Sequence, residues 1–121
     1  MRSHLSLAVS AAVLLGALVS PRRARADETT ATSSIAQLIV IEPGSKSYRL
    51  FHGAIWLEYD KQQVNYRWGG LHCKGRDLSE SSVQLLFASF RSEYSVTLEY
   101  VGSEYRGKQY RCITAFTVTK N

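Results

Sequence analysis

One stretch of helical periodicity inside a series of strand-like segments constrains the fold of this chain most strongly. Over residues 77–91 the apolar side chains recur at i, i+3, i+4 and i+7, which places them on one face of a helix. These residues are Val83, Leu86, Phe87 and Phe90. Asp77 followed by Glu80 three residues later is typical of a capped helix start. The pattern therefore predicts one amphipathic helix with this face buried.

Strand-like segments lie on both sides of the helix and are marked by β-branched residues or by apolar–polar alternation. Pro followed by Gly within residues 42–45 (EPGS) predicts a type II turn. Gly53 is expected to bulge or bend the second strand. Another turn is expected at 60–62, and a polar loop over 102–108. The expected strands are residues 35–41, 47–59, 64–68, 95–100 and 109–119.

The resulting order, β-β-β-α-β-β, is that of a small five-stranded OB-like Greek-key barrel with one helix. A β-sandwich with an inserted helix would produce the same local pattern and stays open as an alternative. Residues 27–34 are polar and have no periodicity, so we expect a flexible N-terminal lead there. A single mainly β domain over residues 35–121 follows.

Residues 1–26 have the three-part layout of a secretory signal peptide. A short basic start precedes an apolar run over 5–19, and Ala24-Arg25-Ala26 places small residues at the −3 and −1 positions of a cleavage site. The run is shorter than the roughly 20 apolar residues of a membrane-spanning helix. We expect a secreted or periplasmic protein with no stable membrane insertion after cleavage; an uncleaved anchor is the alternative.

Loss of this segment changes the charge of the chain. The full sequence has 15 Lys and Arg against 10 Asp and Glu, a formal net charge of +5. Four basic residues and no acidic ones lie in the first 26 positions: Arg2, Arg22, Arg23 and Arg25. The remaining 95 residues therefore carry 11 basic and 10 acidic side chains, a net charge of +1. Nucleic-acid binding requires a clustered positive face, so we expect no nucleic-acid partner.

Cys73 and Cys112 are the two cysteines of the sequence. An oxidising compartment and a small, marginal core both favour a disulfide between them. In the chain-entropy model a bridge closing a loop of about 40 residues stabilises the fold by about 4 kcal/mol. Two free thiols, or half a metal site built with His72, are the alternatives. A zinc site would need further ligands, so we expect no metal.

The sequence contains no serine-hydrolase elbow, no HExxH motif and no glycine-rich phosphate loop. Two histidines, His52 and His72, follow residue 26, and neither belongs to such a motif. A disulfide-bonded Cys73 could not act as a nucleophile. We therefore expect a non-enzymatic protein without a cofactor.

Aromatic residues point to binding. All 13 Phe, Trp and Tyr residues follow residue 26, and seven are Tyr. Tyr and Trp present a flat apolar face that suits sugars and protein surfaces, although packing between strands accounts for most of them. OB folds hold oligosaccharides through two loops, which correspond here to 42–47 and 102–108. Trp56 is added because it should face outward from its strand. The candidate ligand-binding residues are Ser45, Lys46, Trp56, Tyr105 and Arg106.

Residues 81–101 (SSVQLLFASFRSEYSVTLEYV) form a short helix that leads directly into a strand of the form S-V-x-L-x-Y. This step resembles the B subunits of bacterial AB-type toxins, namely the enterotoxin and subtilase-cytotoxin B subunits. The resemblance implies an exported OB fold, a pentameric ring and binding of cell-surface glycans. The cysteine positions depart from the enterotoxin pattern, and no glycan-contact motif can be carried over residue by residue.

Two functions remain as hypotheses. The first is an exported non-enzymatic binding module, similar to a glycan-binding toxin B subunit. The alternative is an exported inhibitor or accessory subunit that docks on another envelope or secreted protein through an aromatic face. The oligomeric state distinguishes them, because a ring former should be a pentamer and an inhibitor a monomer or dimer.

The leader predicts a processed chain that begins near Asp27. Intact-mass analysis of exported protein should show loss of residues 1–26. A mass that retains these residues in the exported fraction would instead identify an uncleaved anchor.

Overall fold

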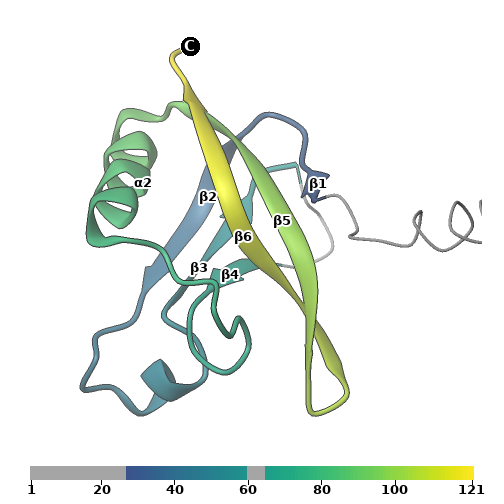
Figure 1. The fold of residues 1–121 in the computed structure, drawn as a ribbon. Coiled ribbons are helices and arrows are strands. Elements are labelled where there is room, and N and C mark those ends of the chain that lie inside the picture. Colours follow the sequence, from purple (N-terminus) through teal and green to yellow (C-terminus); the bar gives the residue numbers. More distant parts are fainter. Residues whose placement is uncertain (1–26, 60–64) are drawn as a thin grey trace, which may run out of the picture.

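The computed structural model describes residues 27–59 and 65–121. The expected leader over 1–26, the expected turn at 60–62 and Val64 of the expected third strand lie outside the described residues. Figure 1 shows the strands wrapped into a barrel with the helix α2 beside strand β2. The elements in chain order are β1 (Glu28–Thr29), β2 (Ser33–Val40), the 3-10 helix η1 (Lys46–Arg49), β3 (Gly53–Leu57), β4 (Tyr66–Trp68), α2 (Glu80–Ser92), β5 (Ser95–Tyr105) and β6 (Lys108–Thr119).

Backbone pairing closes five of these strands into a ring. β2 pairs with β3, β3 with β4, β4 with β6, β6 with β5, and β5 again with β2. The β4–β6 pair is parallel, and the other pairs are antiparallel. A parallel pair needs a long connection, which α2 and β5 form here. The ring confirms the expected small OB-like barrel with one helix and excludes a sandwich of two separate sheets.

The interior of the barrel is apolar because inward and outward residues alternate along each strand. On β3 the side chains of Ile55 and Leu57 are buried, whereas Trp56 between them is partly exposed. On β4 the same alternation buries Trp68 and leaves Arg67 partly exposed. The core consists of Ile35, Ile55, Leu57, Tyr66, Trp68, Leu86, Val96, Leu98 and Ile113.

The helix α2 is confirmed, but its start differs from the expectation. It begins at Glu80 rather than at 77, and its N-cap is Ser79, whose hydroxyl accepts a hydrogen bond from the Ser82 amide. The Asp77 carboxylate accepts a hydrogen bond from the Leu78 amide and pairs with His52, so it is not available as a cap. The prediction that Asp77 is the N-cap was therefore wrong, because a tertiary contact engages its side chain.

The buried stripe of α2 also differs from the expectation. Leu86 is fully buried and Ser89 is 1% exposed, whereas Phe87 is 51% and Phe90 38% exposed. Only one narrow side of α2 meets the barrel, and the residues at i, i+3 and i+6 on that side (Val83, Leu86 and Ser89) occupy it. The prediction that Phe87 and Phe90 are buried was therefore wrong, because the spacing alone did not determine which side of the helix faces the barrel.

The segment between β2 and β3 is coiled where a strand was expected. The Ser45 hydroxyl accepts a hydrogen bond from the Ser47 amide and so caps η1. This local capping favours a turn over an extended chain. The turn at 42–45 is confirmed by the hydrogen bond from the Ser45 amide to the Glu42 carbonyl, at 2.9 Å. The expected type II geometry of this turn was wrong, because that geometry requires a positive φ at Gly44 and Gly44 has none.

Gly53 begins β3, where a bulge or bend was expected. It pairs in register with Val40 on one side and with Trp68 on the other. A Cβ atom at this position would lie 2.1 Å from a ring carbon of Trp68. Close packing against the core tryptophan is thus what requires a glycine here.

The expected polar loop over 102–108 is a β-hairpin. β5 continues to Tyr105 and β6 begins at Lys108, with Ser103 opposite Tyr110. The two turn residues, Arg106 and Gly107, have φ values of 52° and 81°. Two consecutive residues with positive φ are typical of a type I′ turn, whose twist matches that of the paired strands.

The N-terminal lead is paired rather than loose. β1 lies antiparallel to β5, with Glu28 opposite Tyr100. The Thr30 amide donates to the Leu98 carbonyl at 2.9 Å, and the Thr30 hydroxyl accepts from the Leu98 amide at 3.0 Å. β2 then begins at Ser33. The expectation of a flexible lead over 27–34 was therefore wrong. Its polar sequence without periodicity gave no sign of these tertiary hydrogen bonds.

The disulfide between Cys73 and Cys112 is confirmed, with the two Cα atoms 5.6 Å apart. It links the loop after β4 to the middle of β6 and leaves no free cysteine in the described chain. Within residues 27–59 and 65–121, no helix is long and apolar enough to cross a membrane.

The position of α2 predicts different costs for two neighbouring substitutions. Leu86→Ala should lower the free energy of unfolding by about 2–5 kcal/mol, because it leaves a cavity in the core. Phe87→Ala should change it by less than about 1 kcal/mol, because half of that side chain already meets solvent. Urea denaturation of both variants checks this. Equal losses would mean that Phe87 is buried by a partner in solution.

Candidate ligand-binding site

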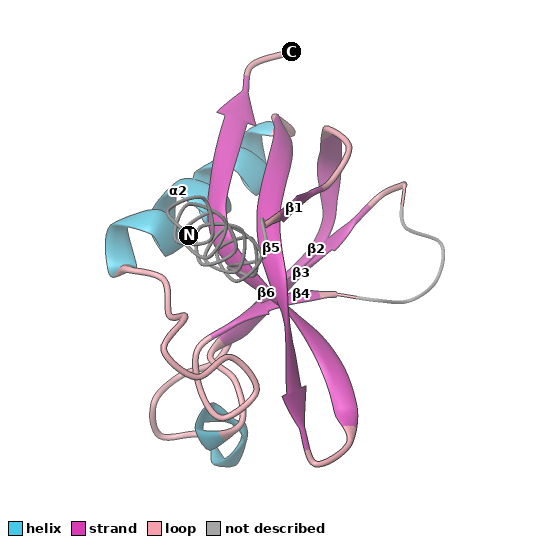
Figure 2. Cartoon of the chain, turned by 45° about the vertical axis from the view of Figure 1, so that its right-hand side comes forward, coloured by secondary structure: helices cyan, strands magenta, loops and turns pink. Residues whose placement is uncertain are grey.

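Three segments meet at the end of the barrel opposite the C-terminus. Figures 1 and 2 both show η1, the loop between β4 and α2, and the tip of the β5–β6 hairpin at this end. Phe51, which follows η1, and Tyr105 and Tyr110 of the hairpin all have ring contacts with His72 of the loop. The first candidate site lies where they meet.

We call this site the Arg67 cluster. It brings together one cation, one imidazole and three aromatic rings from separate parts of the chain. Arg67 lies on β4, and the others come from the segment before β3, the loop after β4, and both strands of the hairpin. The Arg67 cluster consists of Phe51, Arg67, His72, Tyr105 and Tyr110.

The His72 ring lies at the centre of the Arg67 cluster. It stacks on Tyr110, with ring centroids 4.0 Å apart and planes within 7°. Its centroid is 5.3 Å from that of Tyr105 and 5.7 Å from that of Phe51. The Arg67 guanidinium lies 4.0 Å from the Phe51 centroid and 4.9 Å from the Tyr110 centroid. Such cation–π contacts hold a guanidinium flat against apolar surface.

The disulfide and the strand register explain why these residues meet. Arg67 is opposite Cys112 in the parallel pair of β4 and β6. The bond from Cys112 to Cys73 holds the preceding residue, His72, beside the same strand. Tyr110 is two positions before Cys112 on β6, and the His72 amide donates to the Leu50 carbonyl at 2.9 Å.

The Arg67 side chain also determines the tautomer of His72. Nη1 of Arg67 lies 2.7 Å from Nδ1 of His72. A guanidinium can only donate, so Nδ1 accepts and the neutral ring carries its proton on Nε2. The Arg67 Nε donates to Oδ1 of Asn65 at 2.9 Å.

No acidic side chain of the described residues forms an ion pair with Arg67. Burial lowers the pKa of the Arg67 guanidinium from its ordinary value, and Tyr110 opposes this shift. An arginine stays charged in a protein, so the site holds a partly buried positive charge that no carboxylate of the described residues neutralises. Such a group favours an anionic ligand.

His72 is buried, with 6% of its surface exposed. Burial lowers the pKa of its imidazole, and the positive charges of Arg67 and Lys108 lower that pKa further. Folding therefore favours the neutral form of the His72 ring, in agreement with its role as acceptor from Arg67.

Two residues predicted from the sequence lie at this site. Tyr105 belongs to the Arg67 cluster through its contact with His72. Arg106 occupies the turn of the hairpin and holds its guanidinium 5.4 Å from the Tyr105 centroid. The hairpin tip therefore joins a second arginine to the Arg67 cluster.

The other three predicted residues lie elsewhere. Ser45 caps η1 with its hydroxyl, and Lys46 is the exposed first residue of η1. Trp56 is half-buried on β3, in register with Gln37. In the described part of the chain, no hydrogen bond or ring contact joins any of them to the Arg67 cluster.

Four members of the Arg67 cluster were missed by sequence reasoning. The signal for Arg67 was present, because it occupies an outward position in the alternation of its strand. The expected disulfide could also have placed His72 near Tyr110, two residues before Cys112. Phe51 had no such signal, since its segment was expected to be a strand.

Metal binding finds no support in the described residues: no group of three or more His, Cys, Asp or Glu side chains is placed to hold an ion. Cys73 is in the disulfide, which removes the ligand that half a metal site with His72 would need.

No protein-family model matches the chain, and neither the curated proteins nor the solved structures include a match.

The environment of His72 predicts how stability depends on pH. Its lowered pKa means that the unfolded chain binds more protons between the folded pKa and the ordinary value of about 6.5. The free energy of unfolding should therefore fall as the pH drops below about 6.5. His72→Phe keeps a ring in the stack but does not titrate, so this dependence should weaken. Identical pH profiles for the two proteins in chemical denaturation would contradict the prediction.

Proposed function

We propose that this chain is an exported, non-enzymatic binding module and that the Arg67 cluster, together with the hairpin tip, binds an anionic glycan. The observation that carries the proposal is the charge of Arg67, which lies among aromatic rings without a carboxylate partner in the described residues. A terminal sialic acid combines a carboxylate with a flat sugar body and fits this chemistry.

The arrangement of polar and apolar surface supports a glycan over a simple inorganic anion. Tyr105 is partly exposed and offers a ring against which a sugar can pack. Arg106 adds a second guanidinium, with its planar set of hydrogen-bond donors, at the exposed end of the hairpin. The backbones of the strands are engaged in closing the ring, so the outward side chains of the strands, the loops and the hairpin tip are the parts available for a ligand.

Export is part of the proposal. The leader expected over residues 1–26 and the disulfide between Cys73 and Cys112 both fit an oxidising, extracytoplasmic compartment. A net charge of +1 after cleavage gives no reason to include a nucleic-acid partner.

A specific observation favours the alternative, an exported inhibitor or accessory subunit that docks on another protein. Three large apolar side chains of α2 are exposed: Leu85 by 49%, Phe87 by 51% and Phe90 by 38%. Phe87 and Phe90, three positions apart, form one exposed apolar face, and Leu85 lies on the opposite flank of α2. Such a face is typical of protein contacts. The same face would also serve a homo-oligomer such as the pentamer that the toxin resemblance implies.

Glycan capture by the processed protein tests the proposal. The wild-type chain should bind sialylated or otherwise acidic glycans on an array, and Arg67→Gln should weaken this by about tenfold or more through loss of a charged hydrogen bond. Combined Tyr105→Ala and Arg106→Ala substitutions should abolish capture with a nearly unchanged melting temperature.

Arg91→Gln is the matched control, because Arg91 also lies over an aromatic ring, that of Phe87, but on α2. It should leave glycan capture unchanged. Arg67→Lys adds a second comparison, since lysine keeps the charge and loses the planar donors, and it should retain part of the binding. A wild-type protein that captures no glycan, but elutes as a monomer and co-purifies with one envelope protein, would favour the inhibitor or accessory-subunit function.

A further inference from the structure

A separate cleft lies on the other side of the wall formed by the segment before β3 and by β4. Successive residues on this wall face opposite ways, as expected for extended chain. Phe51 and Arg67 belong to the Arg67 cluster, whereas the next residues along the chain, His52 and Trp68, line the cleft. The cleft therefore does not share its lining with the Arg67 cluster.

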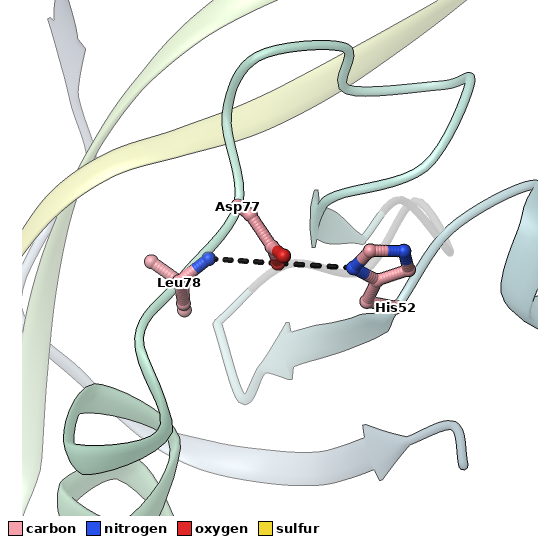
Figure 3. Close-up of polar contacts among 3 residues, drawn as sticks. All are labelled: His52, Asp77 and Leu78. Carbon is pink, nitrogen blue, oxygen red and sulfur yellow. Dashed lines mark hydrogen bonds and ion pairs between the residues drawn. The ribbon is translucent and has the colours of Figure 1, made fainter. Parts of the chain in front are cut away.

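His52 is held rigidly in the wall of this cleft. Its Nδ1 lies 3.0 Å from Oδ1 of Asp77, and the same oxygen accepts from the Leu78 amide at 2.9 Å (Figure 3). The Tyr48 ring stacks on the imidazole at 3.8 Å between centroids. Gly69, at φ +74°, lies so close to the ring that a Cβ atom there would be 2.2 Å from Nδ1.

The contact with Asp77 determines which nitrogen of His52 can serve a ligand. A carboxylate can only accept, so Nδ1 carries a proton, and the other ring nitrogen accepts a hydrogen bond when the ring is neutral. That nitrogen points away from Asp77 (Figure 3). The imidazole, which is among the lining residues of the cleft, thus has one ring nitrogen that Asp77 does not engage.

The size and lining of the cleft fit one small organic group. Its volume is about 380 Å³, near the lower end of the range for ligand pockets. Apolar side chains such as Ile41, Pro43 and Val83 form one part of the lining, and Trp68 contributes another. Tyr48 adds an aromatic ring that is partly exposed.

The charge of the lining residues determines which kind of ligand group the cleft favours. Three carboxylates, from Glu42, Asp77 and Glu80, line the cleft, and no Lys or Arg is among its lining residues. Apart from the contacts of Asp77, these carboxylates have no ion pair with the described residues. The cleft is therefore opposite in charge to the Arg67 cluster.

We infer that this cleft is a second binding site, for an ammonium group carried on a small apolar or sugar body. The Asp77–His52 pair and the two glutamates surround the ammonium, while Tyr48 and the apolar wall pack against its carbon skeleton. Two sources share this chemistry, an amino sugar and a lysine side chain. The site stands independently of the proposed glycan site, because the two use different residues.

Titration of the isotopically labelled processed protein, followed by amide and imidazole resonances, tests this inference. Glucosamine and Nα-acetyl-lysine methylamide are the two ammonium probes. N-acetylglucosamine and the Nε-acetylated lysine derivative are the matched neutral controls. An ammonium probe should shift the resonances of His52, Gly69, Asp77 and Glu80, with a dissociation constant on the order of 1 mM. The stronger of the two probes identifies the source.

Combined Glu42→Gln and Glu80→Gln substitutions should raise the dissociation constant of the ammonium probe by about tenfold. They remove two of the three carboxylates and leave the His52 contacts in place. Glu99→Gln is the control with the same chemical change on an exposed residue of β5 outside the cleft. It should leave the dissociation constant unchanged.

Equal binding of ammonium and acetylated probes, or equal affinity in the double variant and in the control, would overturn the inference. So would shifts scattered over the whole surface. Glycan capture through the Arg67 cluster should persist in the double variant, so failure of one site is distinguishable from failure of the other.

Discussion

The parallel pairing of β4 with β6 is the contact on which the rest of this structure depends. It closes the barrel, and it places Arg67 opposite Cys112. The disulfide to Cys73 then ties the loop after β4 to the same strand, which brings His72 against Tyr110. Loss of this pairing would open the ring and separate the members of the Arg67 cluster, since they come from segments that are otherwise distant in the sequence.

The same wall separates two surfaces of opposite charge. Because side chains alternate along extended chain, Arg67 faces the aromatic cluster while Trp68 faces the core and the acidic cleft. Each surface has one fixed imidazole: His72 accepts from a guanidinium, and His52 donates to a carboxylate. These opposite partners give two histidines of one small domain different hydrogen-bonding roles, and they underlie the proposals of an anionic ligand on one side and an ammonium group on the other.

Sequence reasoning succeeded where the determinants are local. The helix, the turn at 42–45 and the strand order depend on periodicity, Pro-Gly chemistry and β-branched runs, all of which are visible in short windows. It failed where a tertiary contact competes with a local preference. Asp77 pairs with His52 instead of capping α2, and Phe87 faces outward because the barrel covers only the side of the helix that carries Leu86.

The candidate site divides in the same way. Tyr105 and Arg106 could be chosen from the sequence because they stand between two strand patterns, where a chain reversal exposes side chains. The roles of Arg67 and His72 depend on the closed barrel, which places aromatic rings around Arg67 and buries His72. The sequence by itself thus determined the order of elements, the cysteine pair and the polar turns, because these follow from neighbouring residues. Only the tertiary structure decided which charges lack partners and which histidines are held in place, because burial and electrostatic compensation depend on contacts between distant segments.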